Sequence, residues 1–142
     1  MTLVLTQISR FGITMAADSA VLSRQQLPSG VWRQRVLTGV KKLQPITKLQ
    51  SGVSVWGEGL VGNEDSDIWL DQFIRNRESE YDSLDAFATL LQNELRTLIP
   101  DIDPENNPWG TIGFHLAGFV ESEGRKVPTF YHIHNGRSQV LE

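Results

Sequence analysis

Residues 2–21 of this chain read TLVLTQISRFGITMAADSAV, and this stretch decides how the rest of the sequence is interpreted. Apolar and β-branched residues partly alternate over 2–9 and again over 13–21, which predicts two strands. The segment Arg10-Phe11-Gly12 between them is a short turn. We therefore expect a β-hairpin that returns Asp18 to the start of the chain.

Thr2 is a candidate nucleophile, because removal of the initiator methionine would place it at the N-terminus. An N-terminal threonine combines a hydroxyl nucleophile with an α-amine, whose reference pKa of about 7.7–8.0 allows it to act as the general base. Many proteins begin with Met-Thr, so this feature alone predicts little. If Met1 is retained, the amine is an amide and the base is lost.

Asp18 and Lys42 supply the charges that such a nucleophile needs. A buried lysine beside a hydroxyl favours the alkoxide electrostatically, and a carboxylate keeps that lysine charged and oriented. The alternative interpretation is that Asp18 caps a turn, and that Lys41 and Lys42 are solvated surface residues.

The remaining sequence predicts further strands and two helices. We expect strands over 31–38, 48–57, 111–121 and 127–136, helices over 63–80 and 83–100, and a polar loop over 101–110. Pro28 and Gly30 interrupt the strand pattern over 23–30, Pro45 argues against a continuous central strand, and Ser83 is a candidate N-cap. Strands, two helices and two more strands form an α+β pattern, with helices packed on a sheet. No repeat or linker divides the chain, so we expect one domain over 1–142.

Composition excludes several classes of protein. The net charge is −4, with 13 basic and 17 acidic residues, so no footprint for nucleic acid or for an anionic membrane surface is present. There is no cysteine, which excludes disulfides and a thiol nucleophile. No apolar run approaches the roughly 20 residues of a membrane helix, and the N-terminus does not read as a signal peptide. We expect a cytoplasmic protein.

Two candidate metal-binding patterns are weak. His132 and His134 share one face of a predicted strand, but zinc takes three or four ligands and His115 is the only other histidine. The segment 101–106 resembles the start of a calcium loop but lacks the required glycine and the closing glutamate. We therefore expect no metal and no cofactor.

Three motifs together resemble the proteasome β-subunit family of N-terminal nucleophile hydrolases. They are GITMAADSAV at 12–21, KKLQPI at 41–46 and SVWGEG at 54–59, and GFHLAGFVESEGRKVPTFYHIHNG at 113–136 is similar to a later hairpin of that family. The resemblance implies an αββα sandwich. Because the chain ends soon after the last motif, whereas the family continues, we expect the C-terminal part of this fold to be missing.

The resemblance also implies roles for individual residues. Thr2 corresponds to the nucleophile, with its own amine as base, and Asp18 and Lys42 to the acidic residue and the lysine that tune the hydroxyl. Gly57 corresponds to the backbone N–H donor of the oxyanion hole. Val21, Val40 and Val55 fall near positions that line the specificity pocket, which implies an apolar pocket.

The implied activity is hydrolysis of peptide bonds in a peptide or protein through an acyl-enzyme intermediate. Members of the family assemble as rings, so the resemblance also implies a homo-oligomer and leaves room for an unfoldase partner. Two alternatives stay open: a non-catalytic assembly subunit of the same kind, and an amidase that acts on a small amide.

Overall fold

A four-stranded antiparallel sheet forms the centre of the computed structural model, which describes residues 3–26, 28–99 and 110–136. Its strand order is β10-β9-β6-β5. The strands are β5 (Leu43–Ile46), β6 (Ser51–Gly57), β9 (Ile112–Ser122) and β10 (Arg125–His134). The predicted strand over 48–57 is confirmed from Ser51 to Gly57, and the predicted hairpin around 122–126 is confirmed, with Val127 opposite Val120 in the register.

Pro45 lies on β5, at one edge of this sheet. An edge strand tolerates proline because one side of its backbone has no ladder to complete. The short 3-10 turn η1 (Thr47–Leu49) then leads into β6. The prediction that Pro45 excludes a central strand is therefore confirmed.

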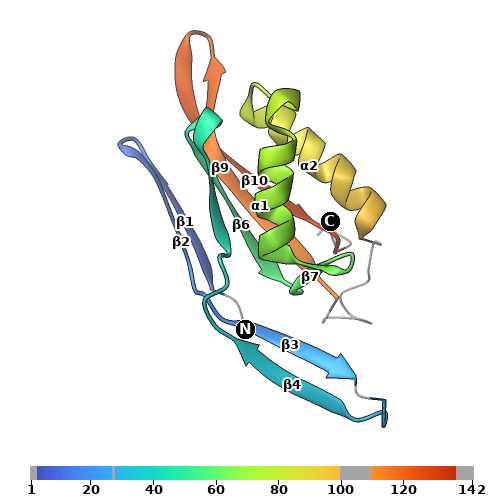
Figure 1. Cartoon of the computed structure of the whole chain (residues 1–142). Helices are drawn as coiled ribbons and strands as arrows, with labels where there is room; N and C mark the ends of the chain where they lie inside the picture. The colour runs from blue at the N-terminus through green and yellow to red at the C-terminus, as the bar shows by residue number, and fades with distance from the viewer. Residues whose placement is uncertain (1–2, 27, 100–109, 137–142) are drawn as a thin grey trace, which may run out of the picture.

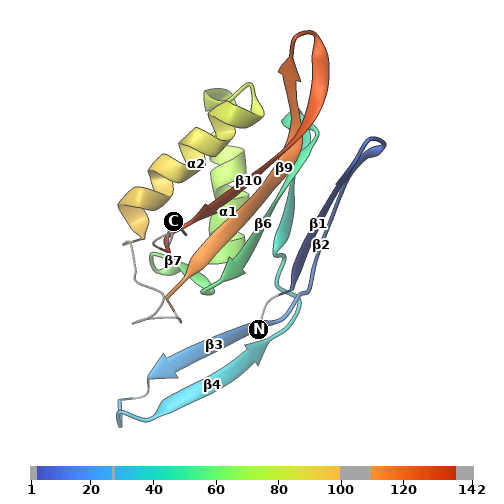
Figure 2. The same cartoon turned by 180° about the vertical axis from the view of Figure 1, so that it is seen from behind.

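Both helices lie on one face of the sheet (Figures 1 and 2). They are α1 (Ser66–Asn76) and α2 (Leu84–Leu98), separated by the short 3-10 turn η2 (Glu78–Glu80). Ser83 caps α2, since its side chain accepts a hydrogen bond from the Ala86 backbone nitrogen. Neither helix is long and apolar enough to span a membrane, among the residues that the structure describes.

The hydrophobic core lies between this helical layer and the sheet. Alternate strand positions face it, such as Val53 and Val55 of β6 and Phe114 and Leu116 of β9, and all four are buried. From the helices, buried apolar side chains pack against them: Leu70, Phe73, Leu84, Phe87, Leu91 and Leu95.

Three two-stranded hairpins complete the described chain. β1 (Val4–Ser9) pairs with β2 (Gly12–Ala17), β3 (Val21–Gln26) with β4 (Trp32–Leu37), and β7 (Leu60–Val61) with β8 (Glu64–Asp65). The first confirms the predicted N-terminal hairpin, in the register Ile8 opposite Ile13. It packs toward the face of the sheet that the helices leave open, where Met15 approaches Gly52.

The expected αββα sandwich is wrong. In the described residues, one helix-covered sheet is accompanied by small separate hairpins, and no second layer of helices is present. The physical reason is that β1 and β2 pair only with each other, so no second extended sheet forms on which further helices could pack.

Candidate active site

Asp18 and Lys42 form an ion pair, with Lys42 Nζ 2.8 Å from Asp18 Oδ1. Asp18 follows β2 directly and Lys42 precedes β5 by one residue, so the ends of two separate strands bring them together. The structure therefore joins the two charged residues that the sequence singled out. The alternative of a solvated Lys42 is wrong, because only 3 % of this residue is exposed.

Burial makes the Lys42 ammonium dependent on its partners. An unpaired charge in a protein interior costs several kcal/mol. A buried lysine ammonium is therefore stable only when its N–H groups donate hydrogen bonds to acceptors. Besides donating to Asp18, Lys42 Nζ donates to the backbone carbonyl of Ala20. The Lys42 backbone carbonyl in turn accepts from Val55 N at 2.9 Å, which fixes the root of the side chain against β6.

Asp18 is the exposed partner of this pair, with 31 % of its side chain accessible to solvent. The hydrogen bond from Lys42 is the main cause that holds the pKa of Asp18 below its ordinary value, and the backbone N–H of Leu3 adds to this lowering. Leu3 N lies 3.0 Å from Asp18 Oδ1. The Asp18 backbone nitrogen also donates to Leu3 O at 3.0 Å, so the two residues continue the β1–β2 ladder.

These backbone partners are the part of the site that the sequence analysis missed. Ala20 contributes a carbonyl and Leu3 an N–H, and neither contribution depends on the side chain. No residue pattern marks such groups. The hairpin register is the one sequence signal that could have placed Leu3 opposite Asp18.

Thr2 lies outside the described residues, as does Met1, so the position of the predicted nucleophile is not described. Residues 101–109 of the predicted loop over 101–110 also lie outside them.

Gly57 ends β6, two residues beyond the Val55 that hydrogen-bonds to Lys42. Its φ of +91° belongs to the left-handed region that favours glycine, and a Cβ there would overlap the Thr111 backbone carbonyl. The next residue, Glu58, donates its backbone N–H to Thr111 O at 2.8 Å. The backbone conformation and the close approach of Thr111 therefore require glycine at position 57, whether or not this residue takes part in catalysis.

The three valines expected near a specificity pocket do not share one environment. Val55 is only 2 % exposed and belongs to the core beneath the helices, so the expectation that it lines an open pocket is wrong. Val21 Cγ1 lies close to Gly59, and Val40 donates its backbone N–H to Ser19 O at 3.1 Å.

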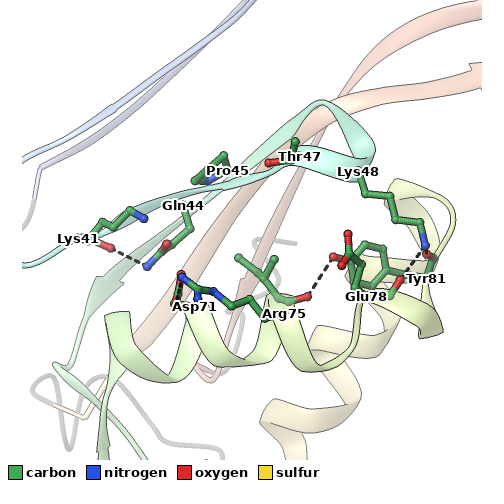
Figure 3. Close-up of a pocket in the computed structure, with 10 residues that line it drawn as sticks. Lys41, Gln44, Pro45, Thr47, Lys48, Asp71, Arg75, Glu78 and Tyr81 are labelled. Atoms are coloured by element: carbon green, nitrogen blue, oxygen red, sulfur yellow. Dashed lines mark hydrogen bonds and ion pairs between the residues drawn. The ribbon is translucent and has the colours of Figure 1, made fainter.

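Two cavities lie elsewhere on the described surface. One, of about 260 Å³, lies between β5 and α1 and carries charged and polar side chains (Figure 3). Two of its cations are already engaged: Lys48 Nζ donates to the backbone oxygens of Glu78 and Tyr81, and Arg75 pairs with Asp71 at 2.9 Å. The other, of about 450 Å³, lies between β2 and the open face of the sheet and is mostly apolar. Neither cavity is lined by Asp18 or Lys42.

The histidines gather on the open face of the sheet. The His115 ring contacts those of Phe130 and His132, and Trp56 packs beside both histidines. Burial lowers the pKa of His115 below its ordinary value. Across the described residues, no three His, Asp or Glu side chains are arranged to hold a metal ion.

Comparison with known proteins gave no match to a family model, to a curated protein or to a solved structure. Any functional proposal for this chain therefore rests on its own residues and their geometry.

Proposed function

We propose that this chain is a threonine-type hydrolase of the N-terminal nucleophile class that cleaves peptide bonds. The observation that carries the proposal is the buried Lys42 amine bound to Asp18, whose carboxylate also binds the backbone N–H of Leu3. Thr2 directly precedes Leu3 in the sequence, so the proposed nucleophile is the chain neighbour of a residue whose backbone N–H binds the Asp18 carboxylate. The support is local to these residues and does not come from the fold.

The proposed reaction begins after Met1 is removed. The Thr2 hydroxyl attacks the carbonyl carbon of the scissile bond, and its proton passes to the free α-amine of the same residue. The tetrahedral intermediate collapses, the C–N bond breaks, and the departing amine takes the proton. The remaining ester on Thr2 is then hydrolysed by water, which returns the hydroxyl and releases the acid.

In this proposal Lys42 and Gly57 stabilise the negative charges that develop during the reaction. The Lys42 ammonium stabilises the developing alkoxide, and Asp18 keeps the ammonium in place. Because Lys42 is already buried and bound, no reorganisation is needed when the charge develops. The Gly57 backbone N–H is proposed as the donor to the oxyanion.

The proposal is tested on protein whose intact mass shows that Met1 has been removed. A panel of fluorogenic peptides measures hydrolysis, and a threonine-directed electrophile such as a β-lactone reports the nucleophile by mass. Thr2→Ala should abolish both turnover and adduct formation. Thr14→Ala is the matched control, because Thr14 is exposed on the same hairpin and away from the ion pair.

The outcomes separate this proposal from its alternatives. Turnover that survives in Thr2→Ala excludes an N-terminal threonine nucleophile. An adduct on Thr2 with hydrolysis only of small amides favours the amidase. Processed protein with neither adduct nor turnover favours a non-catalytic assembly subunit.

A further inference from the structure

β3 and β4 form a two-stranded ribbon, here called the arm, that projects away from the main sheet (Figures 1 and 2). In the described chain no third strand is hydrogen-bonded to either of them. An isolated two-stranded hairpin is marginally stable in water, and its outer edges present unpaired backbone N–H and C=O groups. A ribbon of this kind is stabilised when another surface covers it.

Apolar side chains on the arm are also uncovered. Val36 of β4 is 65 % exposed, and Val31, directly before β4 in the connection between the two strands, is 59 % exposed. At its root, the arm is anchored by the hydrogen bond from Val40 N to Ser19 O. The arm is therefore held at one end, while apolar surface farther along it is left to solvent.

The charge of the arm is opposite to that of the rest of the chain. Between residues 21 and 37 the sequence has three arginines (Arg24, Arg33 and Arg35) and no acidic residue. The whole chain has a net charge of −4, so the remainder carries −7. Arg33 and Arg35 occupy alternate register positions on β4, opposite Gln25 and Ser23.

The opposite charge is concentrated in residues 58–94, here called the acidic layer, which include α1 and most of α2. This segment has ten acidic and two basic residues. Only Asp71, Glu80 and Glu94 form ion pairs with a cation inside the described ranges. Seven other carboxylates of this layer have no ion pair with a side chain that the structure describes: Glu58, Glu64, Asp65, Asp67, Glu78, Asp82 and Asp85.

We infer that the arm docks on the acidic layer of a second copy of this chain. Each copy carries one basic arm and one acidic layer. Every arm can therefore find an acidic layer on another copy, as self-association requires. Pairing of one arm with another arm is disfavoured, since it would bring six arginines together with no acid. Contact between two different surfaces is heterologous, and its repetition closes a ring or extends a chain of subunits.

Nucleic acid is a poorer occupant for the same arm. Three arginines release few counterions, and a body with a net charge of −7 opposes approach to a polyanion. The inference does not depend on the proposed hydrolase activity, because no arm residue takes part in that reaction.

The test is sedimentation velocity of the full chain over a range of protein and salt concentrations. Wild-type protein should associate at low salt and dissociate as the salt concentration rises. Arg33→Glu with Arg35→Glu should weaken association about tenfold or more, because two attractive charges become repulsive. Arg125→Glu with Lys126→Glu is the matched control: it makes the same change in net charge at two exposed residues outside the arm and should leave association near wild type.

A charge swap identifies the occupant. Glu78→Lys with Asp82→Lys should also weaken self-association, and mixing this variant with the arm variant should restore a complex between the two. Arg33→Gln with Arg35→Gln provides a milder arm variant, and thermal melts confirm that each variant folds. A wild-type monomer at low salt, association unaffected by the arm variants, or a nucleic acid that copurifies only with an intact arm would each overturn the inference.

Discussion

Leu3 and Lys42 donate hydrogen bonds to the same carboxylate oxygen of Asp18, although they are far apart in the sequence. The Leu3 backbone nitrogen lies 3.0 Å from Asp18 Oδ1, and Lys42 Nζ lies 2.8 Å from the same atom. One atom of Asp18 therefore links the first hairpin to the residue before β5. Removing this carboxylate should affect the start of the chain and the buried lysine together.

Asp18→Asn should destabilise the fold by about 2 kcal/mol, because the buried Lys42 ammonium loses its charged acceptor. The estimate is at the low end for a buried pair, since a third of the Asp18 side chain is exposed and solvent screens part of the interaction. A thermal melt should show a decrease of roughly 6 °C. Asp71→Asn is the control: it breaks an exposed pair within α1 and should cost only about 0.3–0.5 kcal/mol. Equal losses would mean that Lys42 does not depend on Asp18.

The contribution of Asp18 should depend on pH in the acid range. Its pKa is lowered in the folded state from 3.8, chiefly by the Lys42 hydrogen bond, so the unfolded chain binds the proton more readily. The stability difference between wild type and Asp18→Asn should therefore be constant above about pH 5 and shrink as the pH falls through 3.8 and below. Urea unfolding at a series of pH values measures it. A difference that does not change down to pH 2 would contradict the lowered pKa.

His115 should reduce stability as the pH falls below neutrality. Burial lowers its pKa in the folded state, so below 6.5 the unfolded chain takes up the proton first and the free energy of unfolding decreases with falling pH. His115→Gln should flatten the pH dependence between pH 7.5 and 5. Phe130→Leu is the control, because it removes a ring that contacts His115 without removing a titratable group. That variant should lose stability at every pH tested but should still become less stable toward acid pH, because His115 is retained.

Gly57→Ala should cost about 2–4 kcal/mol in the free energy of unfolding, from a strained positive φ together with overlap of the new Cβ with the Thr111 carbonyl. Gly62→Ala isolates the strain, because Gly62 has a φ of +62° with open space around it. It should cost about 1 kcal/mol. Chemical denaturation compares the two variants, and equal costs would show that the close approach to Thr111 is not limiting.

The elements that the sequence predicted well are those with a local signal. The N-terminal hairpin followed from a short turn between two alternating runs, and α2 followed from Ser83 and a regular apolar spacing. The hairpin register carries Asp18 back to the start of the chain, but its partner Lys42 lies 24 positions further along and was singled out by the resemblance. Local turn and capping chemistry was sufficient for the hairpin and for α2 only.

The elements that were missed depend on partners distant in the sequence. Ser-Arg-Gln-Gln at 23–26 has no apolar alternation, yet it lies in β3 because β4 pairs with it. The αββα sandwich was expected from motifs that describe short strands and turns. Such motifs do not specify how many strands join one sheet, and here the hairpins remain separate from the sheet of β5, β6, β9 and β10.

The arm begins three residues after Asp18 and ends five residues before Lys42, so the bond between these two residues closes a loop of 24 positions. Loop closure costs only about 0.6 kcal/mol for each doubling of loop length. The arm can therefore gain or lose residues at its tip, around Pro28–Gly30, with little change at its base. This makes the tip a suitable place to insert a fluorescent or affinity label, and natural variants of different arm length could keep the same ion pair while changing what the arm reaches.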